Sequence, residues 1–167
     1  MQLEHNTLLK QLHAAFPSEP IHPDSAFDQW GTTYPDAEPY MEQIDGKSWD
    51  QLDRAYIVRR ADALGFLGTK HLAAVLPVYL RAMVEEGVWS PATGMLMLIL
   101  AKPLPGENTG LGSERFDALV QTLTAEQRAV IAVALRAFAE KDADGSLGRA
   151  ARAALDGYWK TYLPAGT

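Results

Sequence analysis

Apolar side chains recur every three to four residues along most of this chain, which is the spacing of one face of an α-helix. No segment shows the strict alternation of apolar and polar positions that a half-buried strand requires. The pattern predicts an all-α protein, a single compact domain over residues 1–167 with about seven helices. The predicted helices cover approximately 2–15, 51–67, 71–86, 91–100, 113–123, 125–141 and the stretch that follows 146.

Residues that favour helix ends stand at several of these boundaries. Pro17 ends the first helix, because proline has no backbone N–H to donate. Ser90 followed by Pro91 is typical of an N-cap and a first helical turn. Thr124 and Gln127 have the spacing of a capping box. Further N-caps are predicted at Ser48, Thr69, Ser113 and Ser146.

The helical pattern breaks off near the N-terminus. Five prolines between Pro17 and Pro39 exclude a long helix there. The same stretch contains Phe27, Trp30 and Tyr34, whereas disordered segments are usually poor in large apolar side chains. We therefore expect residues 18–48 to form an irregular, acidic and aromatic wrap over the helices, with a helical turn at 40–44. Residues 102–112, which are rich in proline and glycine, are expected to form a surface loop.

The negative charge of the chain is concentrated in one segment. The whole chain has a formal net charge of −6. Between Glu19 and Asp53 nine acidic residues and one lysine give −8, so the remainder carries +2. Nucleic-acid binders depend on clustered Lys and Arg, so this charge argues against a nucleic-acid partner.

Several features of the sequence bear on where the protein resides. The longest apolar stretch, 95–101, is far shorter than the ~20 residues needed to span a bilayer. Residues 1–10 lack the basic start and unbroken apolar run of a secretory signal. The chain has no cysteine, which fits a reducing compartment. We expect a cytoplasmic protein without membrane association.

The motifs of catalysis and metal binding are missing from the sequence. Residues 140–147 resemble the start of a calcium-binding loop, but Ala151 stands where a bidentate glutamate should close the site. A helix end followed by a capped helix start explains the same residues. No nucleophile elbow, phosphate-binding loop or dinucleotide fingerprint occurs. The sequence predicts no catalytic residue, no metal and no cofactor, and it favours a protein that is not an enzyme.

Polar side chains on or beside the apolar helix stripes suggest an interhelical pocket. A charge in such a position is costly unless a carboxylate or carbonyl groups meet it. A structural ion pair explains these charges, and a small-ligand or enzymatic site is the alternative. The pocket of that alternative would be formed by Arg60, Asp62, His71 and Tyr79.

The acidic segment is the feature most suggestive of a binding role. Its carboxylates cannot all be buried, so they form a solvated negative face, with Trp30, Tyr34 or Tyr40 as candidate exposed aromatics. Such a face suits a basic protein partner. The alternative is that the aromatics fasten the wrap to the core and the acids only aid solubility. The proposed binding residues are Asp24, Asp28, Trp30, Tyr34, Asp36 and Glu38.

Three runs of the sequence resemble a family of small bacterial proteins, domain of unknown function sixty-seven-fourteen. The runs are Gly46–Asp53, which includes Trp49, then Asp62–Leu67, and the Leu-Pro-x-Tyr-Leu segment at 76–80. The resemblance covers about Tyr40 to Glu140 and implies a bacterial origin and an α-helical domain. It implies no activity. By analogy with small acidic bacterial proteins, an immunity-type inhibitor of a basic toxin is one form the function could take.

Overall fold

The structure of the protein is a computed structural model that describes residues 2–22, 37–86, 90–104, 107 and 111–165. Within these residues it contains eight α-helices, three short 3₁₀-helices and no β-strand, so the predicted all-α fold is confirmed. The elements are α1 (Gln2–Ala15), α2 (Ala37–Ile44), η2 (Trp49–Gln51), α3 (Arg54–Arg59), η3 (Ala61–Gly65), α4 (Thr69–Glu86), α5 (Pro91–Leu100), α6 (Ser113–Thr122), α7 (Ala125–Lys141), α8 (Ser146–Gly157) and η4 (Trp159–Tyr162).

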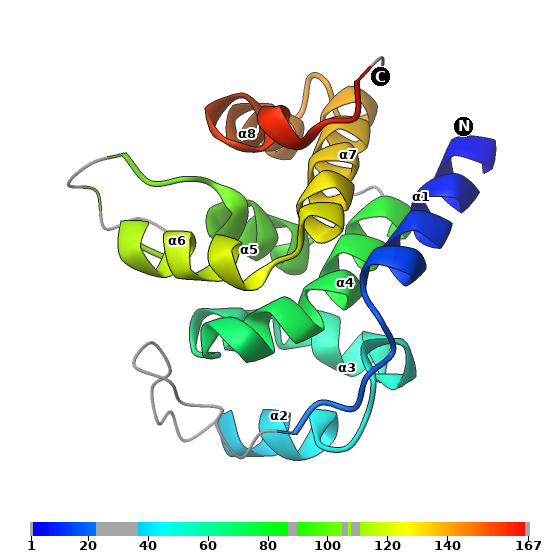
Figure 1. Cartoon of the computed structure of the whole chain (residues 1–167), viewed down its shortest axis with the longest axis vertical. Helices are drawn as coiled ribbons and strands as arrows, with labels where there is room; N and C mark the ends of the chain where they lie inside the picture. Colours follow the sequence, from blue (N-terminus) through cyan, green and yellow to red (C-terminus); the bar gives the residue numbers. More distant parts are fainter. Residues whose placement is uncertain (1, 23–36, 87–89, 105–106, 108–110, 166–167) are drawn as a thin grey trace.

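Helix α4 lies at the centre of the fold (Figure 1). It packs against α1, α3, α5, α6, α7 and η2. Such a position requires apolar side chains around much of the helix, and the sequence of α4 supplies them at helical spacing. Leu72, Val75, Leu76, Tyr79, Leu80 and Met83 are all buried.

The region predicted as one helix over 51–67 is divided in the structure, so this prediction is wrong. The carboxylate of Asp53 accepts a hydrogen bond from the backbone N–H of Tyr56 (3.1 Å), which starts α3 at Arg54. The helix ends at Arg59 because Arg60 has left the helical conformation (φ −100°, ψ 38°). A 3₁₀-helix then continues the chain toward α4.

Several helix starts agree with the capping pattern, and three differ by one residue. One of these is Thr69, which is the first residue of α4 and not its N-cap. Ser90 and Thr124 are the N-caps of α5 and α7, as predicted. Gly112 and Gly145, rather than the serines that follow them, are the N-caps of α6 and α8. Gly112 has φ +74°, a conformation that residues with a Cβ atom rarely adopt.

The turn between α7 and α8 contains the residues that resemble a calcium loop. The carboxylate of Asp142 accepts a hydrogen bond from the backbone N–H of Gly148 (2.8 Å), so it satisfies the start of α8. A Cβ atom on Gly148 would lie 1.9 Å from the backbone oxygen of Asp142, so only glycine fits. The described part of the chain holds no group of three or more candidate metal ligands.

One buried cation fastens α6 to η3. The Arg115 guanidinium, 8% exposed, donates hydrogen bonds to the backbone oxygens of Leu64, Gly65 and Leu67. Carbonyl groups at the end of a short helix are natural acceptors for a cation. Arg115 therefore stabilises the junction between η3 and α4, a role that its place in the sequence did not suggest.

Residues 16–22, here called the strap, connect α1 to the opposite side of the fold. Figure 1 shows this segment leaving α1 and passing α4 toward α2. The backbone of Ile21 exchanges hydrogen bonds with the loop after α2: its N–H donates to Lys47 (2.9 Å) and its oxygen accepts from Gly46 (2.8 Å). The strap is therefore held in place by backbone bonds as well as by burial of Phe16 and Ile21.

Candidate functional site

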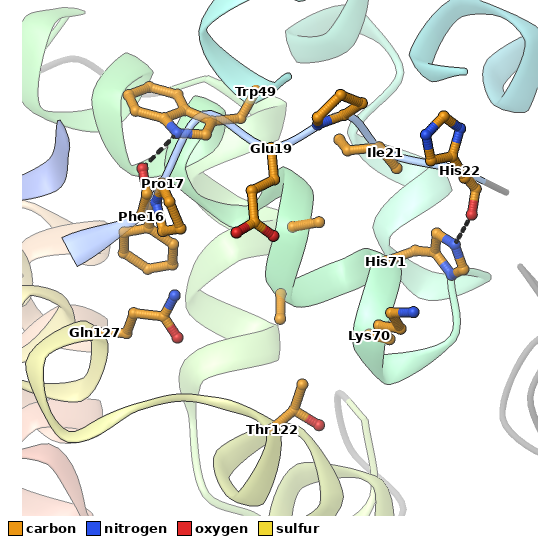
Figure 2. A pocket seen from close by; sticks show the side chains of 13 residues that line it. Phe16, Pro17, Glu19, Ile21, His22, Trp49, Lys70, His71, Thr122 and Gln127 are labelled. Atoms are coloured by element: carbon orange, nitrogen blue, oxygen red, sulfur yellow. Dashed lines mark hydrogen bonds between the residues drawn. The ribbon is translucent and has the colours of Figure 1, made fainter. Parts of the chain in front are cut away.

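A cleft of about 380 Å³ lies beside the strap. Its walls come from strap residues 16–17 and 19–22, from Trp49 of η2, from four residues of α4 between Lys70 and Ala74, and from Thr122 and Gln127 near the α6–α7 corner. Figure 2 shows these side chains arranged around a common space. The cleft thus joins segments that are far apart in the sequence.

Two side-chain hydrogen bonds hold the ends of the strap against the cleft. The indole N–H of Trp49 donates to the backbone oxygen of Phe16 (2.8 Å). The Nε2 atom of His71 lies 3.1 Å from the backbone oxygen of His22 (Figure 2). Since a carbonyl oxygen can only accept, the Nε2 atom of His71 carries the proton.

With the proton on Nε2, the other ring nitrogen of a neutral imidazole is an acceptor. The side chain is only 2% exposed, and its Nδ1 atom has no hydrogen-bond donor in the described residues. In a neutral imidazole such a nitrogen carries partial negative charge. His71 therefore places a ring nitrogen without a described hydrogen-bond partner behind the wall of the cleft.

Two opposite charges line the cleft without pairing. Glu19 of the strap and Lys70 of α4 are both exposed, and neither forms an ion pair with another described residue. Figure 2 shows the Glu19 carboxylate directed into the cleft, whereas Lys70 lies beside His71. Both charges are available to a bound group.

Of the four residues proposed for an interhelical pocket, only His71 lines this cleft. Arg60 and Asp62 form an ion pair (3.5 Å) near the surface. The buried hydroxyl of Tyr79 donates to the backbone oxygen of Ile57 (2.9 Å) and accepts from Tyr40 (3.1 Å). The structure therefore places His71 in the cleft and the other three outside it.

The two buried tyrosines have a structural explanation. Burial raises the pKa of both Tyr40 and Tyr79, because the phenolate form would lose its hydration. The charges of Asp62 and Arg60 have smaller effects on both pKa values: Asp62 raises them and Arg60 lowers them. The hydroxyls serve as hydrogen-bond partners for each other and for Ile57, and they give no sign of acid–base chemistry.

The proposed acidic binding face lies mostly outside the described residues. This applies to Asp24, Asp28, Trp30, Tyr34 and Asp36, and to the side chain of Glu38, whose backbone belongs to α2. Tyr40, the third candidate for an exposed aromatic, is fully buried, so its assignment to the face is wrong. Tyr40 shares the buried apolar face of α2 with Met41 and Ile44, at helical spacing.

The described carboxylates of the acidic segment are all exposed to solvent: Glu19, Glu42, Asp45, Asp50 and Asp53. The apolar side chains of the same stretch are buried, namely Ile21, Tyr40, Met41, Ile44, Trp49 and Leu52. The described part of the segment thus presents an outer acidic surface over an inner apolar one.

Asp50 is the most strongly held of these carboxylates. It accepts hydrogen bonds from the hydroxyls of Ser48 (2.6 Å) and Ser18 (2.8 Å). These two bonds hold the pKa of Asp50 below its ordinary value. Because Ser18 belongs to the strap, Asp50 also ties the strap to η2.

The fold and the cleft define a small all-α protein with an acidic outer segment. The chain belongs to a family of unknown function, DUF6714, whose model matches residues 6–163, so the resemblance noted in the sequence is confirmed. No curated protein matches the chain, and no solved structure does. In the described residues no helix is both long and apolar enough to cross a membrane.

Proposed function

We propose that this protein is a non-enzymatic binding module that docks on a basic protein through the acidic surface of residues 19–53. The observation that supports the proposal is the separation of acidic from apolar side chains within this segment. Its described carboxylates face solvent, whereas its described large apolar side chains pack into the core. The five described carboxylates and Lys47 leave a charge of −4 on a surface that is anchored to the fold, and the whole segment carries −8 in the sequence.

Complementary charge accelerates the encounter of two proteins and disfavours wrong partners. Anchoring adds to this effect, because a surface held in one conformation loses less entropy on binding than a free tail. One form of such a module is an immunity-type inhibitor in the cytoplasm of a bacterium, which would neutralise a basic toxin.

The test compares two charge-reversal variants of equal net charge. The first changes Asp24, Asp28, Asp36 and Glu38 to lysine. The control changes four acidic residues outside the segment to lysine: Glu107, Asp117, Glu140 and Asp144. Partners are captured from the native cell with the wild-type protein, and their association rates are then measured with all three proteins.

We expect the first variant to associate about tenfold more slowly at low salt and the control to remain within about twofold of wild type. Added salt should reduce the wild-type rate, because exposed charges are screened. Equal rates for the two variants, or a wild-type rate that salt does not change, would contradict the proposal.

A further inference from the structure

We infer that the cleft beside the strap receives an arginine or lysine side chain of the basic partner. The inference rests on the proposed function and names the contact by which the partner would be anchored. It depends on three features: a free carboxylate in the cleft, apolar walls, and a buried ring nitrogen without a described partner behind one wall.

The free carboxylate belongs to Glu19. It points into the cleft (Figure 2) and forms no hydrogen bond or ion pair with a described residue. Two other described carboxylates near the strap are already engaged: Asp50 accepts from Ser18 and Ser48, and Asp45 lies 3.7 Å from the His22 ring. Glu19 is therefore the acidic group of the cleft that a cation can pair with at no loss of an existing bond.

The apolar walls match the stem of a long basic side chain. Phe16, Pro17 and Pro20 come from the strap, and Ala73 and Ala74 come from α4. Lysine and arginine pack their aliphatic stems against apolar surface while the charged group reaches a polar partner. A cleft of about 380 Å³ is large enough for one such side chain.

His71 adds to the attraction for a cation. Its Nδ1 atom is buried behind the cleft wall and lacks a donor among the described residues, so its partial negative charge is not compensated there. Lys70 acts in the opposite sense, since its ammonium group lines the same cleft and repels a cation. Removal of the Glu19 carboxylate and removal of the Lys70 ammonium group should therefore change the affinity for a cation in opposite directions.

A side chain delivered by a protein suits this cleft better than a free small molecule. Several lining residues, among them Pro17, His22 and Thr122, are exposed, so a small ligand would remain largely hydrated. A docked partner excludes that water, and its other contacts supply affinity that a single ion pair in solvent cannot.

The experiment measures binding of a fluorescent oligo-arginine peptide at low salt to the wild type and three variants. Glu19→Gln removes the carboxylate from the cleft. Glu42→Gln is the matched control, because Glu42 is an exposed carboxylate of the same segment that does not line the cleft. Lys70→Gln removes the opposing charge. Thermal unfolding confirms that each variant is folded.

We expect Glu19→Gln to weaken binding about fivefold, Glu42→Gln less than twofold, and Lys70→Gln to strengthen it about twofold. The NMR resonance of the Trp49 indole N–H should shift on titration in the wild type and much less in Glu19→Gln, because Trp49 lines the cleft. These results together would support an arginine in the cleft.

Other outcomes would overturn the inference and separate it from the proposed function. Equal losses for Glu19→Gln and Glu42→Gln would mean that the acidic surface attracts the peptide without using the cleft. Unchanged or weaker binding after Lys70→Gln would mean that the cationic group of the peptide does not lie beside Lys70 in the cleft. Absence of peptide binding would also overturn the inference. The proposed function is tested separately, by the association rates of the charge-reversal variants.

Discussion

Two tryptophans form the same kind of hydrogen bond in different surroundings. The indole N–H of Trp49 donates to the backbone oxygen of Phe16 (2.8 Å), and that of Trp159 donates to the backbone oxygen of Leu100 (2.7 Å). In both cases the bond joins segments that are far apart in the sequence. Trp159 is surrounded by the aromatic rings of Phe116, Tyr158 and Tyr162.

Trp49, by contrast, lies at the boundary between core and surface. Its indole ring stacks at a tilt on the ring of His13 (4.6 Å between centroids) and lines the cleft beside the strap. The hydrogen bond of Trp159 therefore joins two parts of the core, whereas that of Trp49 holds the strap, a surface segment, in place. The effect of losing this hydrogen bond depends on whether the tryptophan is enclosed by the core or lines the cleft. We therefore expect different effects when Trp49 and Trp159 are substituted.

The largest effect is expected for Trp159→Ala. The side chain is fully buried, so its removal leaves a cavity and an unpaired carbonyl at Leu100. We expect a loss of about 3–5 kcal/mol in the free energy of unfolding, measured with urea. A loss below about 1 kcal/mol would show that the aromatic cluster is not an integral part of the core.

A smaller and more local effect is expected for Trp49→Phe. Phenylalanine preserves most of the apolar contact but cannot donate to Phe16, so the cost should be about 1 kcal/mol. Hydrogen exchange should become faster at the amides of Ile21 and Gly46, which bond the strap to the loop after α2. The amides of α7 and α8 serve as the internal control, and equal acceleration there would contradict a local role.

The smallest effect is expected for Ser18→Ala and should depend on pH. Ser18 donates to Asp50, whose pKa is lowered in the folded protein. A lowered carboxylate pKa contributes stability above the unfolded value of ~3.9 and loses it as the pH falls through the folded value. Because Asp50 is exposed, Ser18→Ala should cost only a few tenths of a kcal/mol at neutral pH, and about nothing in acid.

Urea unfolding at neutral and acidic pH measures this difference. In the Asp50→Asn background the effect of Ser18→Ala should no longer depend on pH, since the titrating group is absent. A pH-dependent difference that persists in that background would assign the effect to another carboxylate.

Much of the fold could be predicted because its signals are local. The apolar spacing of α4 and the capping pair Thr124 and Gln127 act within a few residues of chain, and both appear in the structure as expected. The prediction failed over 51–67, where Asp53 begins a new helix and Arg60 departs from helical geometry. There the capping bond and the packing around η3 outweighed a continuous apolar stripe.

The candidate site was predicted less well. His71 was identified from its position beside an apolar stripe, but Glu19, Trp49 and Lys70 were not associated with it. The structure brings them together only because the strap folds back across α4. No pattern of sequence spacing marks residues that become neighbours in this way.

The sequence by itself determined that the chain forms helices, which of their faces are apolar, and that its negative charge is concentrated in one segment. These properties follow from side-chain type and short-range spacing. Only the tertiary structure decided which carboxylate enters a cleft, which tryptophan is enclosed by the core, and that Arg115 donates to the backbone oxygens of η3 and the residues after it. Such outcomes depend on contacts between distant segments, and these exist only once the chain has packed.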